Sequence, residues 1–276
     1  RVLSGVSLSG DRFFYEDPLA SDGTVHRQYW PDVCCCPINL ARMLPTLGQY
    51  IYSANATDIA VHLFIQGEAQ FTIGGQAVTL RQKTGYPWEG GIALQIDAAA
   101  PFTSNVRVRI PGWCRDALLA VNGETLNIDD IMQSGYAVIA RLWQPGDTIT
   151  LDLAMPVERI FAHPAVRADV GQVALRRGPI VYCLEEADND IPPWQLLLSD
   201  ESPIESVFEP DMLEGVAVLR GMALAPDERD WNDPPTLYST SRPRFVSAPF
   251  TAIPYYAWDN RQPGAMNVWL HAAQNT

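Results

Sequence analysis

The sequence contains no apolar run of about 20 residues, the length that a transmembrane helix requires. Basic residues are also few, because 19 Lys and Arg stand against 32 Asp and Glu and give a net charge of −13. Nucleic-acid binding depends on Lys and Arg side chains that neutralise phosphates. We therefore expect a globular protein that has neither nucleic acid nor a membrane as a partner, with its acidic residues on a solvated surface.

Common catalytic and metal-binding motifs are missing as well. The sequence has no C-x-x-C, no H-E-x-x-H, no G-x-S-x-G and no P-loop. Its four histidines, His26, His62, His163 and His271, are scattered without metal-ligand spacing, so each is better interpreted as an ordinary surface or core residue. The absence of C-x-x-C also weakens the hypothesis of a thiol redox protein.

The first residues include no initiator Met and no basic segment followed by an apolar one, so no signal peptide is visible. The chain reads as the interior of a longer protein. Its five cysteines form an odd set without framework spacing, which argues against a secreted disulfide-rich module. Free thiols favour a reducing compartment, and we expect a cytoplasmic protein.

Three of these cysteines are consecutive, Cys34, Cys35 and Cys36. Neighbouring residues are too close for an unstrained disulfide, which needs about 4.4–6.8 Å between Cα atoms. Grouped thiols indicate soft-metal ligation or a thiolate nucleophile. The alternative is a buried turn that uses Cys as a small hydrophobic residue. Two adjacent thiols supply only half of a tetrahedral metal site.

The pattern along the chain is mostly that of short strands. Gly74-Gly75 and Asn122-Gly123 each stand between apolar runs and predict tight hairpins. Residues 106–110 and 148–153 alternate with period two, as half-buried strands do. A second set of strands is predicted at residues 173–175, 180–184, 216–219, 245–253 and 266–271.

Other segments are predicted to be helix or loop. Apolar residues at 40, 43, 44, 47 and 51 have helical spacing and predict a helix around residues 38–52, which Pro45 would kink. Residues 186–212 and 225–244 are rich in Asp, Pro and Ser, which predicts long surface loops.

Two carboxylate pairs and several tryptophans are further candidates for glycoside chemistry. The pairs Glu185-Glu186 and Asp129-Asp130 follow predicted strands or turns, where solvated side chains are the simpler interpretation. The tryptophans could stack on sugar rings or belong to the core, and the core is the usual place for aromatics in β-sandwiches; they are Trp88, Trp113, Trp143 and Trp258.

A series of motifs then resembles glycoside hydrolase family 127, the β-L-arabinofuranosidases. They run in order through nearly the whole chain: Leu3 to Leu8, Phe13-Phe14-Tyr15, His26-Arg27, Trp30, Cys35-Cys36-Pro37-x-Asn39-x-Ala41-Arg42, Tyr86-Pro87-Trp88, Arg109-Ile110-Pro111-Gly112-Trp113, Val121-Asn122-Gly123, Met155-Pro156-Val157, Arg177-Gly178-Pro179 and Tyr255-Tyr256-Ala257-Trp258. The chain departs from the usual pattern at Asp17, Val33, Cys34 and Ile38, and none of these changes affects the two motif thiols.

The resemblance implies a mainly β chain with two antiparallel β-sandwich domains, preceded by a short helical remnant of an (α/α)6 catalytic barrel. The barrel end would occupy residues 1–53, the first β-sandwich residues 54–156 and the second residues 157–276.

The resemblance also implies a site. Cys35 corresponds to the catalytic nucleophile, which also contacts zinc, Cys36 to a zinc ligand, and Tyr15 to an aromatic position near the sugar. The acid/base glutamate and the remaining zinc ligands of the family would lie before Arg1.

The expected function is therefore that of the C-terminal portion of a retaining, zinc-dependent glycoside hydrolase with a cysteine nucleophile. Its substrate would be a carbohydrate of the L-arabinofuranoside class, and a homodimer is possible. We expect these 276 residues to be inactive by themselves. The alternative is a non-catalytic β-sandwich module that binds carbohydrate or mediates oligomerisation.

Overall fold

The structure is a computed structural model that describes residues 5–30, 32–33, 35–229 and 237–273. It divides into two compact units, described separately below. The small unit comprises residues 41–156, and the large unit comprises residues 1–40 together with residues 157–276. The assignment of residues 1–53 to the end of a helical barrel stays a prediction.

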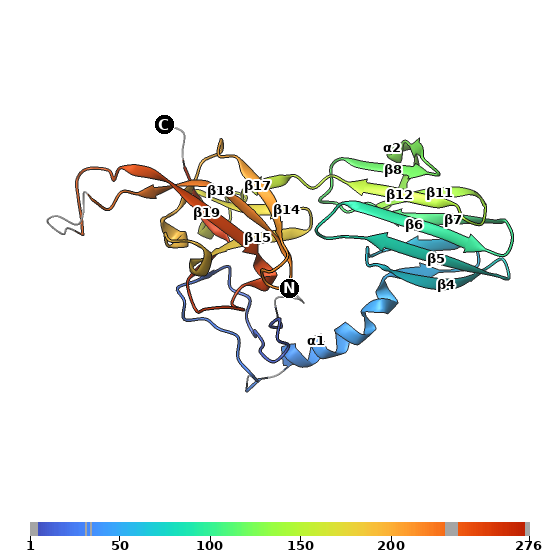
Figure 1. Ribbon diagram of the computed structural model, residues 1–276, viewed down its shortest axis with the longest axis horizontal. Helices are drawn as coiled ribbons and strands as arrows, with labels where there is room; N and C mark the ends of the chain where they lie inside the picture. The colour runs from blue at the N-terminus through green and yellow to red at the C-terminus, as the bar shows by residue number, and fades with distance from the viewer. Residues whose placement is uncertain (1–4, 31, 34, 230–236, 274–276) are drawn as a thin grey trace. The chain divides into compact units, whose positions relative to one another are not determined.

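The small unit contains two sheets. A five-stranded sheet has the order β10-β11-β7-β3-β2, and a six-stranded sheet has the order β4-β5-β6-β12-β8-β9 (Figure 1). The strands are β2 (Tyr52–Ala54), β3 (Asp58–Val61), β4 (Gly67–Ile73), β5 (Gln76–Thr84), β6 (Gly91–Ala98), β7 (Phe102–Arg109), β8 (Ala117–Val121), β9 (Glu124–Leu126), β10 (Met132–Gln133), β11 (Tyr136–Trp143) and β12 (Thr148–Leu153). Only β3 and β7 run parallel to each other.

Both sheets contribute to one hydrophobic core. Side chains along β6 and β12 alternate between buried and exposed, as a half-buried strand requires. The buried members include Leu94 and Ile149 from the six-stranded sheet and Val106 and Trp143 from the five-stranded sheet. The Trp143 indole donates to the Ser104 carbonyl over 3.0 Å, so its polar atom is satisfied inside the core.

The two hairpins predicted from the sequence are confirmed. Gly74 and Gly75 have φ values of 57° and 86°, and they join β4 to β5. Asn122 and Gly123, at 51° and 83°, join β8 to β9. Two successive positive φ values give the tight turn whose twist matches that of the strands, which explains the Gly-Gly and Asn-Gly pairs.

The large unit is built on one ten-stranded sheet. Its strands are β1 (Ala20–Ser21), β13 (Val157–Ile160), β14 (Gln172–Arg177), β15 (Ile180–Glu185), β16 (Leu197–Leu198), β17 (Ile204–Glu209), β18 (Val216–Pro226), β19 (Phe245–Pro254), β20 (Met266–Asn267) and β21 (Trp269–Ala272). The hairpin between β14 and β15 closes a ring of strands in the order β15-β19-β18-β16-β21-β14. The resemblance led us to expect two separate sheets here, whereas the strands form a single curved one.

The long loop predicted at residues 186–212 is only partly correct. It contains β17, which pairs with β18 along six residue pairs from Ile204↔Gly221 to Glu209↔Val216. The Asp and Pro residues that suggested a loop flank this short strand. The composition of the whole stretch therefore predicted a loop where part of it is a strand. Of the loop predicted at residues 225–244, residues 230–236 lie outside the described residues.

The predicted helix is confirmed as α1 (Cys35–Thr46), which is followed by a 3-10 turn over Leu47–Tyr50 and contains Pro45. The other α-helix of the described residues is the single turn α2 (Ile128–Ile131), which Asn127 caps by accepting from the Asp129 amide. Within the described parts of the chain, no helix is long and apolar enough to cross a membrane.

Two neighbouring leucines of β8 test the location of the small unit's core. Leu119 is fully buried, whereas the side chain of Leu118 is 66% exposed. We expect Leu119→Ala to lower the free energy of unfolding by about 2–5 kcal/mol, because it leaves a cavity. Leu118→Ala should change it by less than about 0.5 kcal/mol. Urea unfolding at a constant m-value measures both changes, and equal losses would contradict the assigned core.

Candidate active site

Two thiols stand at the first two positions of α1. The side chain of Cys35 is exposed and that of Cys36 is half-buried. Their Sγ atoms lie 3.9 Å apart, well beyond the length of about 2.05 Å of a disulfide bond. The Asn39 side-chain amide donates to the Cys35 carbonyl over 2.9 Å and supports the first turn. The third cysteine of the triplet, Cys34, lies outside the described residues.

The helix can begin with this sequence because a residue in the first turn, such as Pro37, does not need a backbone N–H group. The first four N–H groups of a helix have no partner within it, so a proline there loses no hydrogen bond. Pro37 is also the buried residue of α1. The same unpaired N–H groups favour negative charge nearby.

Tyr15, the third predicted site residue, lies beside the two thiols. The pKa of Tyr15 is raised chiefly by the proximity of Cys35, then by Cys36, and a hydrogen bond with the Cys35 side chain adds to the shift. Half of the tyrosine side chain is exposed. The structure therefore brings together Tyr15, Cys35 and Cys36, the three residues that the resemblance had singled out.

The segment that carries Tyr15 has little regular structure of its own. Phe13 and Gln28 form an isolated antiparallel bridge, with N–O distances of 2.7 and 2.9 Å. Phe13 also packs edge-on against Trp30, with ring centroids 5.6 Å apart. These contacts bring residue 13 next to residues 28–30, and Tyr15 follows two residues later.

The buried guanidinium of Arg27 anchors this segment to the C-terminal part of the large unit. Arg27 is 4% exposed, and it donates to the carbonyls of Trp258 and, over 3.2 Å, Tyr256. Its guanidinium lies 4.4 Å from the centre of the Phe14 ring, which in turn stacks on Trp258 at 4.7 Å. Burial lowers the pKa of Arg27 to about 10, so the side chain still carries its charge at neutral pH.

Two carboxylates, those of Asp259 and Glu185, link Arg27 to further hydrogen-bond partners. Asp259 accepts from the Arg27 amide over 2.7 Å and contacts His26 over 2.8 Å, while its own amide donates to Glu185 over 2.7 Å. Arg261 then binds Glu185 over 2.6 Å. The sequence reasoning noted His26 and Arg27 only as part of a motif, because their partners lie more than 200 residues away in the chain.

This network corrects one expectation from the sequence. We expected Glu185 to be solvated, but it is 5% exposed, and burial is the main reason that its pKa is raised. It is held by Arg261 and the Asp259 amide, so its role is structural. Glu186, Asp129 and Asp130 are exposed as expected. Trp143 and Trp258 are buried, which confirms the core interpretation for these two.

The separation of the two thiols is close to that of two sulfur ligands on one zinc ion. Two sulfurs on a tetrahedral zinc with Zn–S bonds of 2.3 Å lie about 3.8 Å apart. The distance of 3.9 Å between Cys35 Sγ and Cys36 Sγ fits two corners of such a site. In the part of the chain that the structure describes, no group of three or more His, Cys, Asp or Glu side chains could hold a metal ion. The two thiols could thus supply at most half of a tetrahedral donor set.

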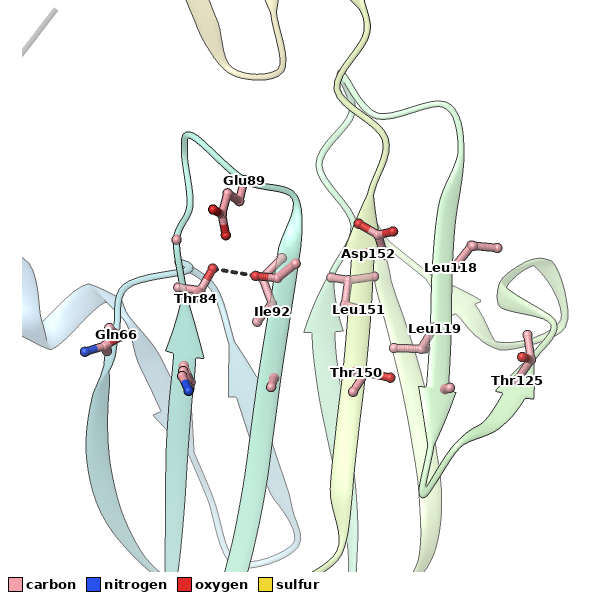
Figure 2. Close-up of a pocket in the computed structure, with 15 residues that line it drawn as sticks. Gln66, Thr84, Glu89, Ile92, Leu118, Leu119, Thr125, Thr150, Leu151 and Asp152 are labelled. Atoms are coloured by element: carbon pink, nitrogen blue, oxygen red, sulfur yellow. Dashed lines mark hydrogen bonds between the residues drawn. The ribbon is translucent and has the colours of Figure 1, made fainter. Parts of the chain in front are cut away.

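A groove of the small unit is lined by other residues. It has a volume of about 570 Å³ and crosses the outer face of the six-stranded sheet. Figure 2 shows Thr84, Ile92, Thr150 and Leu118 along its strands, with the Thr84 hydroxyl donating to the Gly91 carbonyl over 2.8 Å. Its floor contains small residues such as Gly91 and Ala93. None of the predicted site residues lines it.

Comparison with known families agrees with the motifs. Residues 58–155 match the profile described as "Beta-L-arabinofuranosidase, GH127 middle domain". Residues 157–271 match the "Glycoside hydrolase family 127 C-terminal domain". The chain belongs to glycoside hydrolase family 127.

Individual relatives support the same membership. The chain is 33% identical over 290 aligned residues to the non-reducing end β-L-arabinofuranosidase of Bifidobacterium longum subsp. longum. Its structure resembles that of a GH127 β-L-arabinofuranosidase from Geobacillus stearothermophilus T6, with a TM-score of 0.92 and 45% identity over 98% of the chain. A second GH127 β-arabinofuranosidase matches with a TM-score of 0.89 and 34% identity over 98% of the chain. The chain spans 43% of the first protein and 44% of each of the two solved structures.

Arg27 and Arg12 provide a matched pair for testing the anchor. Both lie on the same segment and over an aromatic ring, but Arg12 is exposed, and its guanidinium lies over the Tyr29 ring and donates to the Tyr29 hydroxyl. We expect Arg27→Met to lower the free energy of unfolding by about 3 kcal/mol or more, because it leaves buried carbonyls and carboxylates without their cation. Arg12→Met should cost less than about 1 kcal/mol. Urea unfolding measures both, and a neutral Arg27→Met variant would exclude the anchor.

Proposed function

We propose that the chain supplies the thiol half of the active site of a retaining, zinc-dependent glycoside hydrolase that acts on β-L-arabinofuranosides. The observation that carries the proposal is the juxtaposition of Cys35, Cys36 and Tyr15 in a chain of this family. The two named relatives are β-L-arabinofuranosidases, which supports the substrate class.

In this proposal Cys35 is the nucleophile. Its thiolate attacks the anomeric carbon of the sugar, so that a C–S bond forms while the glycosidic C–O bond breaks. The departing oxygen takes a proton from a carboxylic acid, which the resemblance places before Arg1. Water then attacks the same carbon, the C–S bond breaks, the thiolate returns and the water's proton passes to the carboxylate. Two displacements give retention of configuration.

Cys36, together with Cys35, would hold the zinc ion. A zinc ion supplies positive charge that deprotonates a coordinating thiol, and the sulfur separation in α1 fits two of its four ligand positions. The helix N-terminus adds unpaired N–H groups that favour the same negative charge. The exposure of Cys35 leaves its sulfur accessible to a substrate.

Tyr15 would position the nucleophile and border the sugar. The nearby Cys35 side chain is the main cause of the raised pKa of Tyr15, and Tyr15 is 52% exposed, so a ligand can reach it. The Arg27 anchor would keep the segment of Tyr15 in place, and Tyr15 with it, beside the thiols of α1.

Three cysteine variants of the complete enzyme test these roles. We expect Cys35→Ser to lower kcat by about 10⁴-fold or more, because the nucleophile is lost. Cys36→Ser should lower the zinc content and kcat together. Cys114→Ser is the matched control, since this half-buried thiol of the small unit donates to the Asp116 carbonyl over 3.3 Å and has no proposed role in the reaction.

The measurements are initial rates with p-nitrophenyl β-L-arabinofuranoside and zinc per protein by atomic absorption. A Cys35→Ser enzyme with nearly normal kcat and full zinc content would refute the nucleophile assignment. Unchanged zinc content in Cys36→Ser would remove that residue from the ligand set.

A further inference from the structure

A second hollow of the small unit differs from the groove in Figure 2 in that its lining is mostly polar. It has a volume of about 440 Å³ and opens on the outer face of the five-stranded sheet, within the range of about 300–1,000 Å³ that is usual for ligand pockets. Of the described residues that line it, only Ala54 and Ala60 are purely apolar. Such a lining suits a ligand that is itself rich in hydrogen-bonding groups.

Ala60 makes room for the hollow. It lies on β3, opposite Ser53 of β2 and opposite Arg107 of β7 in the registers of the two strand pairs. Its methyl group is the smallest side chain that can stand between them, so the longer side chains on either side rise around a depression. A larger residue at position 60 would fill it.

One side of the hollow carries a continuous chain of hydrogen bonds. Ser53 Oγ lies 2.8 Å from His62 Nε2, and His62 Nδ1 lies 2.8 Å from the Tyr136 hydroxyl. If the imidazole proton is on Nδ1, Tyr136 can donate its own proton to a ligand and Ser53 can accept from one; with the proton on Nε2 the two ends exchange these roles. The chain thus presents a donor at one end and an acceptor at the other.

The other side carries a compensated ion pair. Asp58 accepts from Arg107 Nε over 3.1 Å and from the Asn105 amide over 3.0 Å. These bonds and that of Thr57, which has the largest effect, lower the pKa of Asp58 to about 2. This bond runs through the Nε atom of Arg107, whose side chain is 35% exposed. Asp58 and Arg107 carry opposite charges, and Arg109 is a further cation near His62. The pKa of His62 is lowered chiefly by burial and then by Arg109, which favours the neutral imidazole.

We propose that this hollow binds a neutral monosaccharide unit of a carbohydrate, through adjacent hydroxyl groups of the sugar. A sugar hydroxyl can both donate and accept a hydrogen bond. It can therefore pair with either end of the Ser53–His62–Tyr136 chain, whichever end is the donor. The lack of large apolar side chains in the lining argues against a lipid or an aromatic ligand. Asp58, the carboxylate of the lining, is paired with Arg107, which argues against a cation. The site lies on the small unit and does not involve the thiols of α1.

NMR titration of the ¹⁵N-labelled chain tests this site. The neutral probes are methyl β-L-arabinofuranoside and methyl β-D-galactopyranoside, and sodium D-glucuronate is the charged probe. We expect at least one neutral probe to cause saturable shifts of the Ser53, Ala60, Arg107 and Tyr136 amides. Ala60→Leu should weaken binding by about tenfold or more because it fills the hollow. Tyr136→Phe removes one hydroxyl and should weaken it by about fivefold.

Ala93→Leu is the matched control, because it makes the same change in the Figure 2 groove and should leave binding unaffected. Where Ala60→Leu fails to fold, Tyr136→Phe decides the test. The proposal is overturned if neither neutral probe shifts these amides, if Tyr136→Phe binds as tightly as the parent chain, or if Ala93→Leu weakens binding as much as Ala60→Leu. Glucuronate binding more than about tenfold tighter than both neutral probes would also overturn it, because the site would then bind the carboxylate, through Arg107, and not neutral hydroxyl groups.

Discussion

The burial of Arg27 is the constraint on which the candidate active site depends. Residues 5–30 contain little regular structure, and the pairing of β1 with β20 joins their later part to the C-terminal strands. Near Tyr15, the Arg27 guanidinium donates to backbone carbonyls near Trp258 and lies over the Phe14 ring. A buried cation is tolerated only where its donors and its charge are satisfied. Asp259 and Glu185 supply that compensation, so the position of Tyr15 rests on residues from the far end of the chain.

The proposed zinc site would need only two adjacent residues of α1 to place two of its sulfur ligands. Adjacent residues at a helix start place two sulfurs at a zinc-compatible separation without any tertiary contact, and Pro37 can follow them because the first turn requires no N–H from it. The rest of a tetrahedral site must come from elsewhere. The proposed catalytic role therefore depends on an assembly larger than the described residues.

Local signals explain what the sequence could predict. The Gly74-Gly75 and Asn122-Gly123 hairpins and the helix at Cys35 depend on backbone preferences of a few residues, and the structure has all three. The run of three cysteines and the motif order brought Cys35 to notice, motif order alone brought Tyr15, and the structure places the two residues together.

The features that sequence reasoning missed depend on distant partners. Glu185 was expected in solvent because its cation, Arg261, comes 76 residues later. The hydrogen bond between His62 and Tyr136 joins residues 74 positions apart, and a scattered histidine carries no sign of such a contact. The short strand β17 becomes visible only through its pairing with β18.

The most direct test of the central claim is to trap the proposed covalent intermediate. The complete enzyme is mixed with a β-L-arabinofuranoside whose leaving group departs rapidly, quenched in acid within the first turnover, and analysed by peptide mass spectrometry. The account predicts that one arabinofuranosyl group is attached to the Cys35 sulfur. A sugar attached to another residue, or an active enzyme that never carries a sugar during turnover, would contradict it.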